Sequence, residues 1–252
     1  MRMTVIGCAG SYPGPESAAS CYLLEEEHGG RTWSVLLDLG NGALGSLQRY
    51  ADASAIDAVF LSHLHADHCL DLCGYYVMRK YHPKGALPRI PVWGPEDTAR
   101  RMAKAYDLDE DPGMNEEFDF IPYGADAVEY GPFKVTVRLV VHPVTAYALR
   151  IEAGGRTLAY SGDSGVCEAL EDTARDADLF LCEASFLEGN PNPPDLHLTG
   201  AEAGRTATVA GSQRLLLTHI PPWHDPQKVL AEAVGEYDGP VDLATPGKTY
   251  DV

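Results

Sequence analysis

The sequence predicts an α/β fold built from two mixed β-sheets that are covered by helices. Throughout the 252 residues, short apolar runs bounded by Gly, Pro or Asp alternate with helical patterns. Strand-rich sequence is concentrated between residues 118 and 160, and helices separate the strands that follow. This order of elements favours two sheets over a single doubly wound sheet.

The first half of the chain alternates predicted strands and helices. Apolar runs between turn-forming residues predict strands at residues 3–8, 20–24, 33–37, 58–61 and 89–93. Helical periodicity predicts helices at 44–50, 67–80 and 95–106, the last with a proline at its N-terminal end, where proline is tolerated. The acidic stretch 107–117 predicts a solvated surface loop, with a flap over a nearby site as the alternative.

The second half begins with strands and ends with strands alternating with helices. Strands are predicted at 118–121, 133–141, 147–152, 157–160, 179–182, 214–218 and near Val241. Helices are predicted at 168–174, 200–210 and 226–236. The glycines within 153–156 predict a hairpin turn between two of the strands.

Composition and charge narrow the class of protein. A chain of 252 residues that is 45% hydrophobic can bury a substantial core, and we expect one domain, residues 1–252. The chain has 19 Lys and Arg residues and 37 Asp and Glu residues, which gives a formal net charge of −18, and it contains no basic block. Long nucleic acid is therefore not the expected partner.

The six cysteines are scattered and lack the paired spacing of a structural zinc site. Buried free thiols explain them better than redox chemistry. The first residues enter a predicted strand without an apolar signal core, and no run approaches the length of a membrane helix. We expect a cytoplasmic protein that does not enter a membrane.

The strongest chemical signal is a cluster of ligand-type side chains directly after the predicted strand 58–61. It consists of His63, His65, Asp67 and His68. Histidine with carboxylate suits zinc, and also manganese or iron(II). The alternating His63 and His65 can point one way from an extended loop, while Asp67 and His68 turn with the start of a helix. One segment can therefore serve two metal ions, provided that other segments supply further ligands.

Further candidates stand where predicted strands end in loops. His142, Asp163 and His219 each follow an apolar run, and strand ends on a packed scaffold can hold side chains rigidly enough for metal geometry. Asp38 also ends a strand. We assign its carboxylate to bracing the ligand loop through hydrogen bonds rather than to the metal.

These residues, in this order along the chain, resemble the motifs of the metallo-β-lactamase superfamily. The resemblance implies an αββα sandwich of two mixed β-sheets flanked by helices, with the site at the edge between the sheets. It also implies two divalent metal ions, zinc first, with Asp163 bridging them. The implied ligands are His63, His65, His142 and Asp163 for one ion and Asp67, His68, Asp163 and His219 for the other. Asp163 stands where drug-hydrolysing β-lactamases carry cysteine, so β-lactam hydrolysis is not expected.

A second stretch is similar to the phosphodiesterase branch that includes the tRNA 3′-processing endonuclease. It contains Glu183 and then His197, followed by Thr199 in register. The resemblance implies a carboxylate and histidine pair beside the metals. We expect His197, polarised by Glu183, to protonate the leaving group, and Asp67 to orient or deprotonate the water that becomes the attacking hydroxide between the ions. Backbone amides and hydroxyls of 161–165 are expected to bind phosphate.

Three observations favour a small substrate. The tRNA enzymes carry a long arm between the histidine and aspartate motifs, whereas only twenty residues separate His142 from Asp163 here. The acidic charge repels a polyanion along its whole length. The segments 7–11, 61–72 and 217–223 closely resemble actinobacterial members of the superfamily that are regarded as cyclic-nucleotide phosphodiesterases. We therefore expect hydrolysis of 3′,5′-cyclic nucleotides.

The sequence is also compatible with other functions. They are a tRNA 3′ endonuclease (ribonuclease Z), a glyoxalase II-like thioesterase and a nucleotide or metal sensor without turnover. The Glu183 and His197 pair, which resembles the phosphodiesterase branch, disfavours the thioesterase. The branch commonly forms homodimers, and residues 75–78 offer a packing face, although an ordinary core helix explains those residues better.

Overall fold

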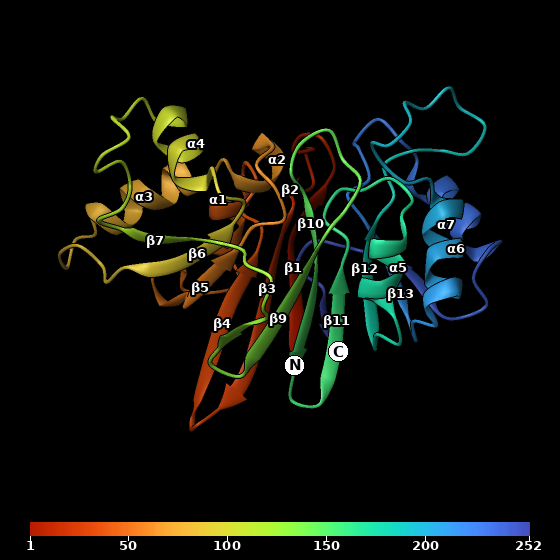
Figure 1. The fold of residues 1–252 in the computed structure, drawn as a ribbon, viewed down its shortest axis with the longest axis horizontal. Coiled ribbons are helices and arrows are strands. Elements are labelled where there is room, and N and C mark those ends of the chain that lie inside the picture. Colours follow the sequence, from red (N-terminus) through yellow and green to blue (C-terminus); the bar gives the residue numbers. More distant parts are fainter.

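The computed structural model describes residues 1–252 and has four layers, helices–sheet–sheet–helices (Figure 1). Helices α1 to α4 lie on the outer side of the first sheet, and α5 to α7 lie on the outer side of the second. The predicted α/β sandwich of two mixed sheets is therefore confirmed.

The first half of the chain supplies one sheet and the second half the other, except for the final strand. The elements of the first half are β1 (Arg2–Ala9), β2 (Ala18–Ala19), β3 (Cys21–His28), β4 (Arg31–Leu37), α1 (Ala43–Leu47), a 3-10 turn η1 (Ala53–Ala55), β5 (Ala58–Phe60), α2 (Ala66–Cys69), α3 (Leu72–Lys80), β6 (Ile90–Gly94), α4 (Thr98–Ala105) and β7 (Phe118–Pro122). Those of the second half are β8 (Val128–Tyr130), β9 (Phe133–Leu139), β10 (Tyr147–Ala153), β11 (Arg156–Tyr160), α5 (Glu168–Ala174), β12 (Leu179–Glu183), α6 (Gly200–Ala210), β13 (Leu215–Thr218), α7 (Pro226–Val234), β14 (Val241–Leu243) and β15 (Thr249–Asp251).

The strand order explains why chemistry collects at one edge. The first sheet runs β15-β1-β3-β4-β5-β6-β7 and the second β14-β13-β12-β11-β10-β9-β8. Strands β4 to β7 are parallel, and so are β11 to β14. Strand β9 is antiparallel to β10, which is antiparallel to β11, so β9 runs with β11. Parallel strands of one sheet end at the same edge, and strands β4, β9 and β11 run upward in Figure 1.

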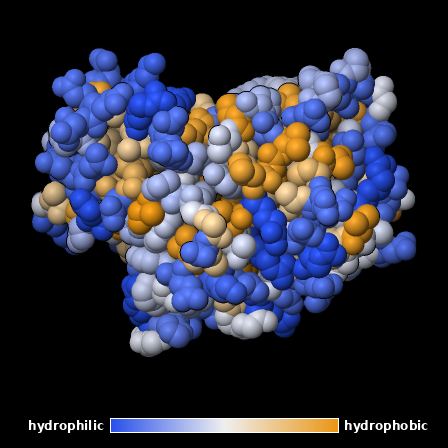
Figure 2. Space-filling model, in the orientation of Figure 1, coloured by the Kyte–Doolittle hydropathy of each residue, from blue (hydrophilic) through white to orange (hydrophobic).

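Three apolar clusters hold the layers together. Residues that alternate along the inward faces of both sheets, such as Leu37 and Ile151, fill the space between the sheets. A second cluster lies under α1 to α4 and a third under α5 to α7. Tyr75 and Tyr76 are buried in the second cluster, as expected for a core helix. Figure 2 shows hydrophobic surface in the upper middle of the molecule, with hydrophilic residues around it.

The predicted hairpin turn is confirmed. Strands β10 and β11 pair antiparallel up to Ala153 and Arg156, which face each other. The two residues between them, Gly154 and Gly155, have φ of 59° and 73°. Two consecutive positive φ angles match the right-handed twist of the flanking strands, and glycine adopts them without a steric cost.

The predicted helix 67–80 was wrong in one respect, because the structure divides it into α2 and α3. The backbone of Leu39 enters the break: its N–H donates to His68 O at 2.8 Å, and its carbonyl accepts from Asp71 N–H at 3.2 Å. In a continuous helix, the carbonyl of His68 and the N–H of Asp71 would instead bond to groups of the same helix. Strands β2, β8 and β15, which have two or three residues each, were not predicted.

The acidic stretch 107–117 is a surface connection, as predicted, but it is anchored at two points. Met114 is buried in the cluster under α1 to α4. Lys80 of α3 forms ion pairs with Glu116 at 3.3 Å and Glu117 at 3.5 Å.

None of the helices combines the length and the apolar character that crossing a bilayer would require.

Candidate metal centre

Every sequence-predicted ligand follows the carboxyl end of a strand, and the structure brings all seven together. The run 63–68 follows β5 of the first sheet, whereas His142, Asp163 and His219 follow β9, β11 and β13 of the second. Their donor atoms form two groups, within each of which all atoms lie within 4.8 Å of one another. The site therefore spans the seam between the sheets.

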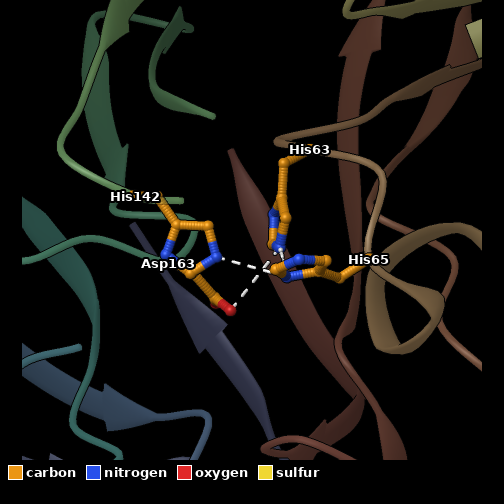
Figure 3. A group of neighbouring side chains, drawn as sticks. All are labelled: His63, His65, His142 and Asp163. Carbon is orange, nitrogen blue, oxygen red and sulfur yellow. Dashed lines mark hydrogen bonds and ion pairs between the residues drawn. The ribbon is translucent and has the colours of Figure 1, made fainter. Parts of the chain in front are cut away.

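The first group contains His63, His65, His142 and Asp163, whose side chains point toward a common centre (Figure 3). His65 Nδ1 lies 3.1 Å from His63 Nε2 and 3.2 Å from His142 Nε2. Asp163 Oδ2 lies 3.6 Å from His63 Nε2. Ligands bound about 2 Å from a tetrahedral zinc ion lie about 3.3 Å from each other. The measured separations match that spacing.

The second group contains Asp67, His68, Asp163 and His219. His219 Nε2 lies 3.1 Å from both His68 Nε2 and Asp67 Oδ2. Asp163 Oδ1 lies 3.1 Å from His68 Nε2 and 3.5 Å from His219 Nε2. All four residues are buried. The arrangement has the same spacing as the first group.

Asp163 belongs to both groups and uses a different oxygen toward each. Its Oδ2 faces His63, and its Oδ1 faces His68 and His219. Oδ1 is buried and has no hydrogen-bond partner. A buried carboxylate oxygen without a donor is costly unless a cation is its partner. The residues present therefore fit a site for divalent metal.

Asp38 braces the ligands, in the manner expected from the sequence. Its Oδ2 accepts hydrogen bonds from His68 Nδ1 at 2.7 Å, Tyr160 Oη at 2.6 Å and Ser62 Oγ at 2.8 Å. Its Oδ1 accepts from Ser62 N–H at 2.7 Å. This network fixes the His68 ring so that Nε2 faces the second group.

Replacing Asp38 with asparagine is expected to weaken metal binding about 10- to 100-fold, because the charged acceptor of His68 Nδ1 is lost. Asparagine tolerates the positive φ of 57° at this position, so the backbone is kept. Competition with a chromogenic chelator measures the affinity. Tyr160→Phe, which removes one donor to Asp38 and keeps the carboxylate, should lose less. Equal affinity in Asp38→Asn and the unaltered protein would contradict the bracing role.

Two further hydrogen bonds fix the imidazole rings. His142 Nδ1–H donates to the carbonyl of Leu196 at 2.9 Å, and His219 Nδ1–H donates to Ser185 Oγ at 2.8 Å. Ser185 Oγ in turn donates to the carbonyl of His219 at 2.8 Å. In both histidines Nε2 is therefore left to face the site. His65 is the exception and faces it with Nδ1.

Burial and charge set the protonation of the ligands. Burial, with help from neighbouring histidines, lowers the pKa of His63 well below its usual value, and burial also lowers the pKa of His142. Burial opposes the charged form of His68, but the carboxylates of Asp163 and Asp38 raise its pKa well above the usual value. The two carboxylates thus favour positive charge at the second group, which a bound cation would supply, whereas burial favours His63 and His142 as the neutral imidazoles that bind metal.

Glu183 and His197 form a pair beside the second group. Glu183 is fully buried, and its Oε1 accepts from His197 Nδ1–H and from Ser164 N–H, each at 2.9 Å. Burial disfavours the charged imidazole, but the Glu183 carboxylate raises the pKa of His197 to about 9. His197 Nδ1 is 3.9 Å from Asp163 Oδ2. The ring also lines a cavity of about 370 Å³ together with Phe186 and Val166.

The expectation that the segment 161–165 binds phosphate was wrong for five of its donors, which are already used within the protein. Three of its donors serve the protein itself: Ser164 N–H bonds to Glu183, Gly165 N–H to the carbonyl of Val141 and Ser161 N–H to that of Leu181. The two serine hydroxyls donate to the carbonyls of their neighbouring glycines. These groups shape the loop and are not free to bind a phosphate.

The sequence did not identify Ser62, Tyr160 and Ser185 as parts of the site. Ser62 directly precedes His63 and Ser185 lies two residues after Glu183, and neither position indicates a role. Tyr160 is a buried residue at the end of a strand, and its position in the sequence looks like that of any core residue. Only the packing of the two sheets against each other brings its hydroxyl to Asp38.

Glycine at position 10 lets the N-terminal loop approach the ligand His219. A Cβ added there would lie 2.1 Å from the His219 carbonyl oxygen. Gly10→Ala should therefore displace this backbone and lower the free energy of unfolding by about 1–3 kcal/mol in chemical denaturation. Gly45→Ala is the matched control, since nothing lies within 4 Å of its Cβ and it sits in helix α1. An equally stable Gly10→Ala protein would mean that the loop is not held there.

Comparisons with known proteins place this site in a family. Residues 34–220 match the family model described as the beta-lactamase superfamily domain. The uncharacterized protein Rv1339 of Mycobacterium tuberculosis is 46% identical over 100% of this chain and 92% of its own length. The ribonuclease Z of Myxococcus xanthus is 30% identical, covering 86% of this chain and 88% of that protein.

A solved structure agrees with the sequence matches. YhfI of Bacillus subtilis, a probable metallo-hydrolase, is 32% identical over the full length of both chains. Its crystal structure, described as a metallo-beta-lactamase fold protein, superposes with a TM-score of 0.87 and covers 99% of this chain and 98% of that one, at 30% identity. The chain therefore belongs to the β-lactamase superfamily and is a metal-dependent hydrolase of that family.

Proposed function

We propose that this protein is a dinuclear phosphodiesterase that hydrolyses small phosphodiesters, with 3′,5′-cyclic nucleotides as its substrates. The observation that carries the proposal is the position of Asp163, whose two oxygens face two separate ligand groups while the Glu183–His197 pair adjoins it. Two cations held a few ångströms apart are the arrangement that enzymes use to hydrolyse phosphate esters.

The two ligand groups are proposed to hold two zinc ions. His63, His65 and His142 supply three imidazole nitrogens to the first, and Asp67, His68 and His219 supply a carboxylate and two nitrogens to the second, with Asp163 shared. Nitrogen with carboxylate is a ligand set typical of zinc. When bound, such ions generate a nucleophile from water at neutral pH and neutralise the charge on the phosphate oxygens.

Asp67 is proposed to orient or deprotonate the attacking water. Burial favours the protonated form of Asp67, but the neighbouring His219 and His68 lower its pKa, so the side chain stays a carboxylate. Its Oδ2 is already 3.1 Å from His219 Nε2. Asp67 is thus fixed at the rim of the second ligand group, where a water molecule can reach it.

His197 is proposed to donate a proton to the leaving oxygen. Its Nδ1–H is committed to Glu183, which leaves Nε2–H as the donor. The buried carboxylate of Glu183 holds the ring in one orientation and stabilises its charged form. Hydrolysis of a cyclic nucleotide then breaks the bond between phosphorus and the 3′ oxygen, and the proton from His197 goes to that oxygen.

The charge and the topology of the chain support a small substrate. The net charge of −18 opposes the binding of a long polyanion, whereas a mononucleotide carries a single negative charge into the local field of the cations. The segment between His142 and Asp163 consists mainly of the short β10–β11 hairpin. The M. xanthus relative that bears the name ribonuclease Z keeps tRNA processing as the competing proposal.

One assay panel tests the proposal. The metal-loaded protein is analysed for bound metal and then offered cyclic AMP, cyclic GMP, a precursor tRNA and S-lactoylglutathione. We expect about two zinc ions per chain and hydrolysis of the cyclic nucleotides. Preferential cleavage of the tRNA or the thioester would replace the proposed function by the corresponding alternative. A fully loaded protein that hydrolyses none of the four would indicate a sensor.

A further inference from the structure

Two loops from opposite ends of the sequence meet beside the second ligand group. Gly10 N–H donates to the carbonyl of Ile220 at 3.2 Å, and Ala9 forms a parallel bridge with the same residue. Pro222 lies against Gly14, whose Cβ position is 3.0 Å from the Pro222 ring. Residues 10–14 and 219–223 therefore form one continuous wall next to the ligand His219.

This wall carries two aromatic rings that the core does not use. Tyr12 and Trp223 lie with their ring centroids 5.3 Å apart and their planes inclined by 38°. Their exposed fractions are 45% and 59%, and only five of the 22 Phe, Trp and Tyr side chains of this protein are exposed. Paired aromatic rings that stay in contact with water provide a surface onto which a further flat ring can pack.

The pair stands close to where the phosphate is proposed to bind. Ser11 N–H lies 3.5 Å from His219 Nε2, the atom that faces the second ligand group. Tyr12 is the next residue, and consecutive Cα atoms are only about 3.8 Å apart. A hydrogen bond of 2.8 Å from Tyr12 N–H to the carbonyl of Gly10 closes the turn at Ser11. The Tyr12 ring thus belongs to the residue that directly follows Ser11, whose N–H contacts the ligand His219.

The chemistry of the substrate supplies the third ring. A cyclic nucleotide joins a phosphodiester to a flat, uncharged heteroaromatic base by one sugar. A base held beside the metals would meet the wall formed by residues 10–14 and 219–223. Stacking of a base on aromatic side chains needs no hydrogen-bond partner and is strongest for large ring systems.

We propose that Tyr12 and Trp223 form the stacking platform for the nucleobase of the substrate, and this inference rests on the proposed function. The platform sets substrate affinity and favours purine over pyrimidine cyclic nucleotides. The metal ligands and His197 act on the phosphate, which is common to all of them. The two parts of the site can therefore be separated by experiment.

The test compares cyclic AMP with its baseless analogue, methyl ribofuranoside 3′,5′-cyclic phosphate. In Trp223→Ala and Tyr12→Ala we expect KM for cyclic AMP to rise roughly 5- to 100-fold, with kcat nearly unchanged. KM for the baseless analogue should stay the same. Trp223→Phe and Tyr12→Phe should restore most of the affinity. Tyr81→Ala, which removes a 69% exposed tyrosine at the end of α3, is the matched control.

A second readout does not depend on turnover. Titration of the metal-loaded protein with the slowly hydrolysed Sp phosphorothioate of cyclic AMP should quench tryptophan fluorescence. The quenching should disappear in Trp223→Phe, which keeps a ring for stacking but removes this fluorophore. Trp93, buried against Phe60, and Trp33 remain in both proteins and provide the internal reference.

The outcomes separate the platform from the proposed function. Equal rises of KM for cyclic AMP and the baseless analogue, or no rise for either, would overturn the platform and leave the phosphodiesterase standing. A protein that hydrolyses no diester but still shows quenching that depends on Trp223 would keep the platform and overturn the function. A Trp223→Ala protein that changes from dimer to monomer with an unchanged KM would assign this surface to a second copy of the chain and overturn the platform.

Discussion

Replacing Asp163 with alanine is expected to remove both metal ions and to reduce phosphodiester turnover by more than about 10³-fold. The carboxylate is the one group whose two oxygens face both ligand sets, so its loss takes a ligand from each. Metal content by elemental analysis and turnover should therefore fall together. His63→Ala, which takes a ligand from the first set only, should also abolish turnover while leaving the second set complete.

The readout that separates binding from catalysis is thermal stability. A ligand at 100 times its Kd stabilises the native state by about 2.7 kcal/mol. Zinc should therefore raise the Tm of the unaltered protein and leave that of Asp163→Ala almost unchanged. Asp119→Ala, which removes an exposed carboxylate paired with Arg89, should bind metal and turn over normally. Two bound ions and intact activity in Asp163→Ala would end the model of a shared aspartate.

Replacing His197 with alanine should leave both metals bound and slow the reaction about 10²- to 10⁴-fold on substrates with poor leaving groups. Its ring donates to Glu183 and makes no closer contact with Asp163 than 3.9 Å, so the ligand sets stay complete. An alkoxide leaving group needs the proton from Nε2, whereas p-nitrophenolate leaves without one. Rates on an alkyl diester and on bis(p-nitrophenyl) phosphate provide the measurement.

A substitution of Glu183 tests the same role of His197 with a smaller expected effect. Glu183→Gln keeps a hydrogen-bond acceptor for His197 Nδ1 but removes the charge, so we expect a smaller loss with the same dependence on the leaving group. Equal losses of rate for both diesters in His197→Ala would contradict an acid role. They would indicate instead that the ring only helps to shape the site.

Local patterns were sufficient for most of the long elements and for the chemical identity of the site. The strand at residues 157–160 and the helix at 200–210 follow from periodicity, and the latter also from the capping box of Thr199 and Glu202. The ligands could be recognised because histidine and aspartate recur directly after apolar runs. Such a pattern is rare without a metal.

What the sequence could not give depends on contacts between distant segments. The break between α2 and α3 is stabilised by the backbone of Leu39, thirty residues earlier, so helical periodicity could not reveal it. Strand β15 forms only by pairing with β1 at the other end of the chain. Likewise, Tyr160 meets Asp38 across the two sheets. Side chains of ordinary strand character acquire roles only once the sheets have packed.

The placement of the ligand groups across the seam has a consequence for how the protein matures. Each set combines side chains from the first sheet with side chains from the second, and His219 comes late in the chain. During synthesis, the 63–68 segment emerges long before its partners and cannot form a complete site alone. Tight binding of a metal ion therefore requires that both halves of the chain have folded and packed together. Chelation should loosen the molecule first along this line, where amide hydrogens would then exchange fastest.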